Sequence, residues 1–146
     1  MQIRTTRFGT VTIDPADVLN FPHGLIGFRE SQRFVLLPDT KSGALGWLQS
    51  CTQPELAVAV VSPRRFVPDY QVRVASGLLQ ALHLSAIDRA YILCVVAPND
   101  GQLTMNLRAP LVINLDRRVG RQIVTTDDQP LQHALSFSSV ELRKAA

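Results

Sequence analysis

The sequence predicts an all-β fold, mostly antiparallel and barrel-like, with one short α-helix near residues 76–84. Three observations predict this fold. Short stretches in which apolar and polar residues alternate recur along the chain, and a period of two is typical of strands that bury one face. Turn-forming residues separate these stretches at regular spacing. Only one segment follows a helical period, so many short strands and a single helix indicate a barrel or sandwich.

The first half of the chain contains a hairpin and three further predicted strands. Residues 2–7 and 10–13 both alternate, and the Phe-Gly pair between them is suited to a tight turn. Three apolar stretches follow, each bounded by Pro or by polar turn residues. These strands span residues 34–37, 47–50 and 56–61.

The predicted helix lies at residues 76–84, where Leu78, Leu79 and Leu82 share one helical face. We expect Ser76 to cap the first turn, because a serine hydroxyl at this position accepts a backbone N–H.

Two strands joined by a hairpin follow the helix. Residues 90–97 are apolar at every position, so both faces of a strand there would be apolar. This predicts a central strand, buried on both faces. In residues 103–107, Leu103, Met105 and Leu107 alternate with polar residues, which predicts one buried face. The intervening Pro-Asn-Asp-Gly at 98–101 is a strong hairpin signal.

The last predicted hairpin pairs residues 111–115 with 122–125 through a turn at 116–120. Beyond it the alternation fades. We therefore expect a single domain at residues 1–126, followed by a loosely ordered C-terminal tail at 127–146.

Composition narrows the class of protein. The 146 residues are enough for one sizeable core but few for two. The N-terminal residues lack the apolar core of a signal peptide, and the longest apolar run is far shorter than the ~20 residues that span a bilayer. We therefore expect a cytoplasmic protein that does not enter a membrane.

The residues used in catalysis form no recognisable arrangement. The histidines His23, His83 and His133 lie far apart in the sequence, and none has the spacing of a metal-binding motif. Cys51 and Cys94 lack a neighbouring cysteine, so they are expected to be reduced structural thiols. We therefore expect neither an enzyme nor a metal or cofactor site.

Two segments stand out as candidate contact surfaces. Residues 21–28 combine two glycines and a proline between Phe21 and Phe28. These two aromatic residues are expected to fix both ends of a rigid loop in the core, with Leu25 and Ile26 at its tip. Such a loop is either a structural elbow or a preformed apolar contact, because a rigid loop loses little entropy on binding. Residues 62–70 add a second Pro-bounded loop that carries Phe66, Asp69 and Tyr70, although an aromatic beside such a bend more often packs into the core.

Seven short motifs, taken in order, resemble those of the flagellar assembly factor FliW family. The motif Asn-Leu-x-Ala-Pro-x-Val-Ile-Asn at residues 106–114 is the most specific. The other six lie at residues 21–28, 34–38, 48–50, 54–57, 68–70 and 120–124. The resemblance covers residues 1–125.

The resemblance implies a cytoplasmic β-barrel-like binding protein. It implies that the protein binds newly made flagellin as a chaperone. It also implies that the protein binds and antagonises CsrA, the RNA-binding translational regulator, and so relieves repression of flagellin mRNA. Because the net charge is +3, the protein is a poor mimic of RNA, and contact with CsrA is expected away from its RNA-binding face or through a local acidic patch such as Asp127-Asp128.

The alternative is a basic β-barrel that binds RNA directly. It is suggested by Arg117, Arg118 and Arg121 near the tip of the last hairpin. We expect no direct contact with nucleic acid under the leading hypothesis. The candidate partner-binding residues are Phe21, Leu25, Ile26, Phe28, Phe66, Asp69, Tyr70, Asn106, Asn114, Arg117 and Arg118.

Overall fold

The computed structural model describes residues 1–135 of the chain. It contains one short α-helix, α1 (Ser76–Ala81), among strands and three single-turn 3₁₀ helices, η1 (Pro15–Asp17), η2 (Pro63–Arg65) and η3 (Ile87–Arg89). The strands are β1 (Gln2–Thr5), β2 (Gly9–Thr12), β3 (Leu19–Asn20), β4 (Arg33–Pro38), β5 (Gly46–Ser50), β6 (Ala57–Val61), β7 (Tyr91–Asn99), β8 (Gln102–Met105), β9 (Leu111–Asn114), β10 (Val119–Gln122) and β11 (His133–Ala134). The all-β prediction with a short helix is confirmed.

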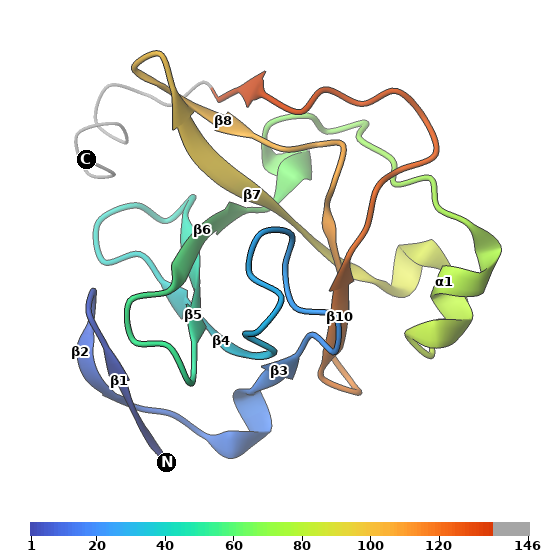
Figure 1. Cartoon of the computed structure of the whole chain (residues 1–146). Coiled ribbons are helices and arrows are strands. Elements are labelled where there is room, and N and C mark those ends of the chain that lie inside the picture. Colours follow the sequence, from blue (N-terminus) through green and yellow to red (C-terminus); the bar gives the residue numbers. More distant parts are fainter. Residues whose placement is uncertain (136–146) are drawn as a thin grey trace.

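The large sheet closes on itself. Its strand order is β11-β8-β7-β6-β5-β4-β3-β10-β9, and β9 also pairs with β7, so the strands from β7 to β9 form a ring (Figure 1). Every pairing in this sheet is antiparallel except that between β10 and β3. Strand β7 is central, because it pairs with β6, β8 and β9 along its length.

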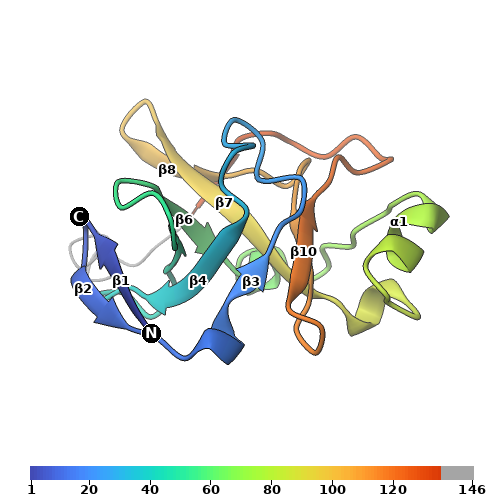
Figure 2. The same ribbon diagram turned by 60° about the horizontal axis from the view of Figure 1, so that its bottom comes forward.

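Peripheral elements lie on opposite sides of the ring. The β1–β2 hairpin forms a separate two-stranded sheet on one side, and α1 lies on the other (Figures 1 and 2). The hairpin is held against the ring by a small apolar cluster in which Ile3 and Ile13 pack with Val18 and Val35.

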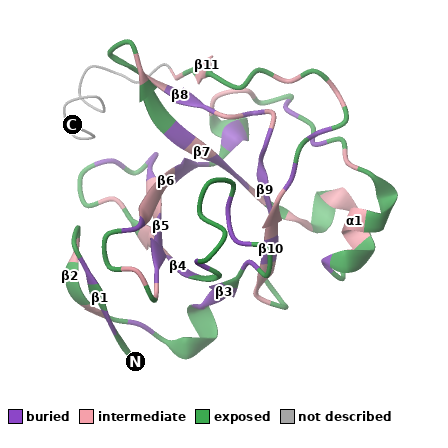
Figure 3. Cartoon of the chain, in the orientation of Figure 1, coloured by how far each residue is buried: buried purple, intermediate pink, exposed green. Residues whose placement is uncertain are grey.

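The interior of the ring is filled by apolar side chains from the strands and from the segment after β3. Phe21 and Phe34 are fully buried and meet edge to face, with their ring centroids 5.7 Å apart. This cluster comprises Leu19, Phe21, Leu25, Phe34, Leu48, Leu56, Val60, Leu93, Leu111 and Ile113. Figure 3 shows the buried residues concentrated along these strands.

A second cluster packs between β7, β8 and the segments beside α1. Cys94 and Met105 are fully buried there, together with Tyr70 and Leu82. Cys94 is therefore a free thiol buried in the core, in line with the expected structural role.

Two local predictions are wrong. The N-cap of α1 is Ala75 and makes no side-chain hydrogen bond, so Ser76 is the first helical residue rather than the cap. The helix ends at Ala81, and His83 follows in a left-handed conformation, with φ at 58°. The helix is therefore shorter than the predicted 76–84.

The last hairpin also differs from the prediction in its register. Strand β10 begins at Val119, which pairs with Asn114, so the turn contains only residues 115–118. The Asn114 side chain accepts the backbone N–H groups of Asp116 and Arg117, and Arg118 has φ at 55°. This side-chain bonding closes a shorter turn than alternation alone indicates.

Residues 127–135 are attached to the barrel. Strand β11 pairs with β8, and the Leu107 N–H donates to the Pro130 carbonyl at 3.1 Å. This part of the expected tail therefore belongs to the folded unit, whereas residues 136–146 lie outside the described residues.

Candidate protein-interaction surface

The 21–28 loop lies across the ring and is anchored by its buried residues (Figure 1). The ring of Phe21 packs against Gly120 of β10 so closely that a Cβ at residue 120 would lie 2.7 Å from it. Leu25 is only 2% exposed and belongs to the barrel interior. The side chain of Leu25 therefore anchors the loop and is not part of its exposed surface.

Two glycines give the loop its shape. Gly24 has φ at +65°, and a Cβ there would lie 2.5 Å from the Cα of Arg29, so the chain doubles back on itself at this point. Leu25 and Phe28 then exchange backbone hydrogen bonds of 3.3 and 2.8 Å around Ile26 and Gly27, and Gly27 has φ at +89°. The result is a tight, closed tip.

A side-chain amide joins this tip to the barrel. The Ile26 N–H donates to Gln122 Oε1 at 2.9 Å, and Gln122 Nε2 donates to the Ala109 carbonyl at 3.0 Å. Ala109 is itself held by Asn106, whose Oδ1 accepts the N–H groups of Arg108 and Ala109 at 3.0 Å each. Asn106 therefore acts within the fold and positions the loop through Gln122.

The exposed part of the loop is apolar. Ile26 is 58% exposed and Phe28 is 43% exposed. The expectation that Phe28 fixes one end of the loop in the core is wrong, because the backbone pairing with Leu25 closes the loop without burying the Phe28 ring.

Phe28 borders an apolar groove of about 340 Å³ on the neighbouring strands. The groove is lined by side chains from β5 to β8. They include Trp47 of β5, Leu56 before β6, Ala57, Val58 and Ala59 of β6, Val96 and Pro98 of β7, and Leu103 of β8. We call this hollow the apolar groove. Trp47 contacts the guanidinium of Arg7 over its ring at 3.7 Å and donates its indole N–H to Asp39 at 2.9 Å, so the ring is held in one orientation.

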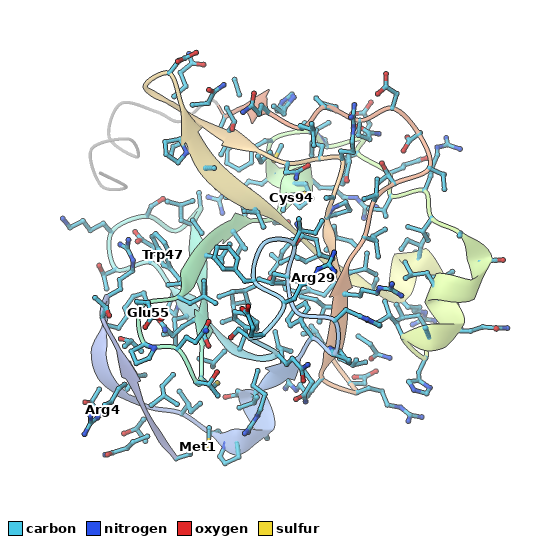
Figure 4. The ribbon with its side chains drawn as sticks, in the orientation of Figure 1. Met1, Arg4, Arg29, Trp47, Glu55 and Cys94 are labelled. Atoms are coloured by element: carbon cyan, nitrogen blue, oxygen red, sulfur yellow. The ribbon has the colours of Figure 1, made fainter. Side chains whose placement is uncertain are left out.

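The other side of the loop borders a polar cleft of about 320 Å³. Its lining comprises His23, Arg29, Arg121 and Gln122, together with Gly24, Leu25 and Ile26 of the loop. We call this hollow the basic cleft. In the view of Figure 4, the exposed Arg29 is labelled near the middle of the picture, and Trp47, which lines the apolar groove, lies to its left.

The second predicted contact loop is mainly structural. Tyr70 is buried, and its hydroxyl donates to the Leu107 carbonyl. Burial raises the pKa of Tyr70 above its usual range, with smaller contributions from Cys94 and Asp127. Phe66 is half-buried and packs against the same core cluster, so Asp69 is the exposed candidate residue in this segment.

The candidates on the last hairpin do not form one patch. Asn114 is buried and donates to the carbonyls of Leu82 and His83 at 2.9 and 3.2 Å, which ties the hairpin to the end of α1. Arg118 faces Asp17 at 3.8 Å, whereas Arg117 is exposed. Arg121 lines the basic cleft instead.

The proposed acidic patch is also engaged within the molecule. Asp128 pairs with Arg108 at 2.7 Å, and Asp127 lies 3.8 Å from Arg73. Their charges are therefore partly compensated on the surface.

The thiols are suited to a structural role. Burial raises the pKa of Cys94 to about 12 and that of the half-buried Cys51 above its usual value. Both thiols are therefore protonated at neutral pH. Within residues 1–135, no group of three or more His, Cys, Asp or Glu side chains is placed to hold a metal ion.

Sequence reasoning missed the residues that hold and flank the loop. In the sequence, Gly120 and Gln122 stand out only as parts of a motif, although they make the contacts with Phe21 and Ile26. Alternate residues of a strand share a face, so the Gly-x-Gln spacing carries a usable signal. The apolar groove and the basic cleft are formed by residues distant in the sequence, so no local sequence pattern predicts them.

Comparison with known proteins decides the family. The family model described as FliW protein matches residues 2–135. The chain belongs to the FliW family. The matched region extends to the last described residue, so it includes β11 as well as the closed ring.

Relatives in the FliW family are similar in sequence to this protein over most of its length. The flagellar assembly factor FliW of Bdellovibrio bacteriovorus is 43% identical over 145 residues, covering 98% of this chain and 83% of the relative. That of Geotalea uraniireducens is 40% identical over 147 residues, covering 99% and 90%. A crystal structure of the flagellar assembly factor FliW superposes with a TM-score of 0.84 at 28% identity, covering 93% of this chain and 97% of the other.

The protein is accordingly a member of a family of flagellar assembly factors. Within residues 1–135, no helix is long and apolar enough to cross a membrane.

Proposed function

We propose that this protein binds flagellin as a cytoplasmic chaperone, and that it also binds and antagonises CsrA, which relieves repression of flagellin mRNA translation. The observation that carries the proposal is the rigid exposed loop, with Ile26 and Phe28 at its surface and the apolar groove beside it. Membership of the FliW family supports the flagellar context. The function requires binding and release, with no covalent step.

An apolar groove next to a rigid apolar loop suits a protein that guards a second polypeptide. An unassembled subunit of a filament exposes amphipathic segments that associate with one another in the absence of a partner. Covering such a segment removes apolar surface from water, which contributes roughly 25 cal/mol per Å². A preorganised loop retains most of that gain, because little backbone entropy is lost when it binds.

Competition between the two partners accounts for regulation. When flagellin is scarce, free protein binds CsrA and lowers the amount of CsrA available to repress translation. When unassembled flagellin accumulates, it occupies the protein and CsrA is released by mass action. The amount of free flagellin then controls translation of its own message.

Co-purification tests the proposal. The tagged protein, expressed at its native level, is expected to recover flagellin and CsrA in separate complexes. Replacing Ile26 and Phe28 with Ser removes exposed apolar contact area and is expected to lower flagellin recovery about tenfold. Leu115→Ser is the matched control, because Leu115 is 41% exposed but lies in the β9–β10 turn. Recovery of neither partner by the unchanged protein would contradict the proposed function.

A further inference from the structure

The basic cleft carries positive charge without a matching acid. His23, Arg29 and Arg121 line it, and none of its lining residues is Asp or Glu. Among residues 1–135, the ion pairs join Arg73 to Asp127, Arg108 to Asp128 and Arg118 to Asp17. Arg29 and Arg121 take part in none of these pairs.

The remaining polar side chain of the cleft is already used. Gln122 accepts from the Ile26 N–H and donates to the Ala109 carbonyl, so its amide holds the cleft wall in place. The backbone of Arg29 is fixed as well, because it packs against Gly24 with no space for a Cβ between them. The cations therefore project from a rigid wall.

Apolar surface flanks the cleft on both sides. Ile26 lines it directly, and Phe28 follows at the edge of the apolar groove. On the other side, Arg121 and Gln122 also line a hollow of about 440 Å³ between α1 and β10, where Leu78 and the 64% exposed Val124 lie. Arg121 thus lies between Ile26 on one side and Leu78 and Val124 on the other.

We propose that the basic cleft receives a carboxylate side chain of flagellin, from a segment in which that acid is flanked by apolar residues. The carboxylate pairs with the guanidinium groups of Arg29 and Arg121, while its neighbours cover Ile26 and Phe28. Arginine suits this role, because its planar group donates to a carboxylate in bidentate geometry. The inference rests on the proposed function and adds the chemistry of the segment that is bound.

A polypeptide fits this surface better than RNA does. A nucleic-acid strand needs several cations in a row to follow its phosphates. The cleft is lined by two arginines, Arg29 and Arg121, and not by a row of cations. A single acidic side chain between apolar residues matches this surface, in which the basic cleft lies beside the exposed apolar residues of the loop.

The test compares two variants that lose the same charge. Arg29→Gln with Arg121→Gln alters the cleft, and Arg4→Gln with Arg89→Gln removes two exposed arginines elsewhere. Arg4 lies in β1, and Figure 4 shows it well away from Arg29. The affinity of each full-length protein for monomeric flagellin is measured by calorimetry at low and at high salt. Thermal unfolding of each variant verifies folding, and Arg29→Gln alone serves if the double variant is unstable.

The cleft variant is expected to bind flagellin about tenfold more weakly at low salt and to lose most of the salt dependence. The control is expected to stay within about twofold, because surface charges at a distance contribute little. Equal affinity of all three proteins would overturn the inference and leave the proposed function intact. Absence of binding by the unchanged protein would overturn both.

A labelled single-stranded RNA is measured in parallel with the same proteins. Little or no effect of the cleft substitutions on RNA binding, together with the loss of flagellin affinity, supports a carboxylate ligand. Weakened RNA binding with unchanged flagellin affinity overturns the inference and assigns the cleft to phosphate.

Discussion

At the level of single residues, three side-chain amides hold the turns on which the exposed loop depends. Asn106 bonds the turn that contains Ala109, and Asn114 bonds the β9–β10 turn and the end of α1. Gln122 completes the set by joining Ala109 to Ile26. Amides suit this work because each offers an acceptor and two donors at once.

Asn106 and Asn114 show which properties of a residue the sequence can predict and which it cannot. The motif at residues 106–114 makes Asn106 and Asn114 candidate contact residues. In the structure both side chains bond the backbone of their own chain. A sequence shows that a polar residue is unusual in its place, whereas its bonding partner depends on the fold.

Replacing Gln122 with Leu tests this network. The substitution removes the acceptor of the Ile26 N–H and the donor to the Ala109 carbonyl. We expect stability to fall by about 1–2 kcal/mol, and the Ile26 amide to exchange its hydrogen faster. Hydrogen exchange followed by NMR measures the loop, and urea unfolding measures the stability. Gln102→Leu, at an exposed position of β8, is the control; equal behaviour of the two variants would contradict the assigned role.

At the level of elements, alternation and turn chemistry predicted the strands well. The stretches at 34–37, 47–50 and 56–61 correspond to β4, β5 and β6, and the Asp100-Gly101 turn joins β7 to β8. These elements are set by neighbours in the sequence, so local rules suffice. The β9–β10 hairpin has a different register from the predicted one. Its turn is shorter, because the Asn114 side chain accepts two backbone N–H groups within it.

The sequence shows that the 21–28 loop is unusual, but it does not show correctly which of its apolar side chains are buried and which are exposed. Its two glycines do provide the expected positive φ angles, and Phe21 is buried as expected. Leu25 is buried and Phe28 is exposed, contrary to expectation, because the chain doubles back at Gly24. The direction of a side chain in an irregular loop follows from such close approaches and not from a period.

Gly24 and Gly27 provide a matched pair for testing the loop. Alanine at either position must adopt a positive φ, which costs about 1–2 kcal/mol. At Gly24 the added Cβ would also lie 2.5 Å from the Arg29 backbone, whereas at Gly27 nothing lies within 4 Å. We therefore expect Gly24→Ala to lower both the melting temperature and flagellin affinity clearly more than Gly27→Ala. Differential scanning calorimetry and a binding titration measure the two effects. Equal losses would show that the close approach at Gly24 does not shape the loop.

At the level of the whole molecule, closure of the ring places the surfaces together. Residues of β7 pair with β9 at one end and with β8 at the other, while β6 pairs along its opposite edge. This arrangement brings the loop after β3 against β10, nearly a hundred residues later, with the Ile26 to Gln122 bond spanning 96 positions. Such pairings are not encoded in any local pattern, so the sequence predicted the barrel class but not the two clefts.

The C-terminal boundary of the folded unit gives the last test. Residues 127–135 cover the edge of β8 through β11, and they add the bonds from Leu107 to Pro130 and from Arg108 to Gln129. Truncation after residue 126 uncovers this edge, beside the buried Met105 and Leu107. Since each lost backbone bond contributes about 0.5–1.5 kcal/mol, we expect stability to fall by roughly 2–4 kcal/mol and the melting temperature by about 10 °C.

Truncation after residue 135 is the matched control, because it keeps every contact described for residues 1–135. Thermal unfolding followed by circular dichroism compares the two truncated proteins with the full chain. A melting temperature that is the same for both truncations would show that the segment between them adds nothing to the barrel. A loss confined to the shorter protein places the edge of the domain after β11, because the uncovered strand β8 then lacks its only partner on that side among the described residues.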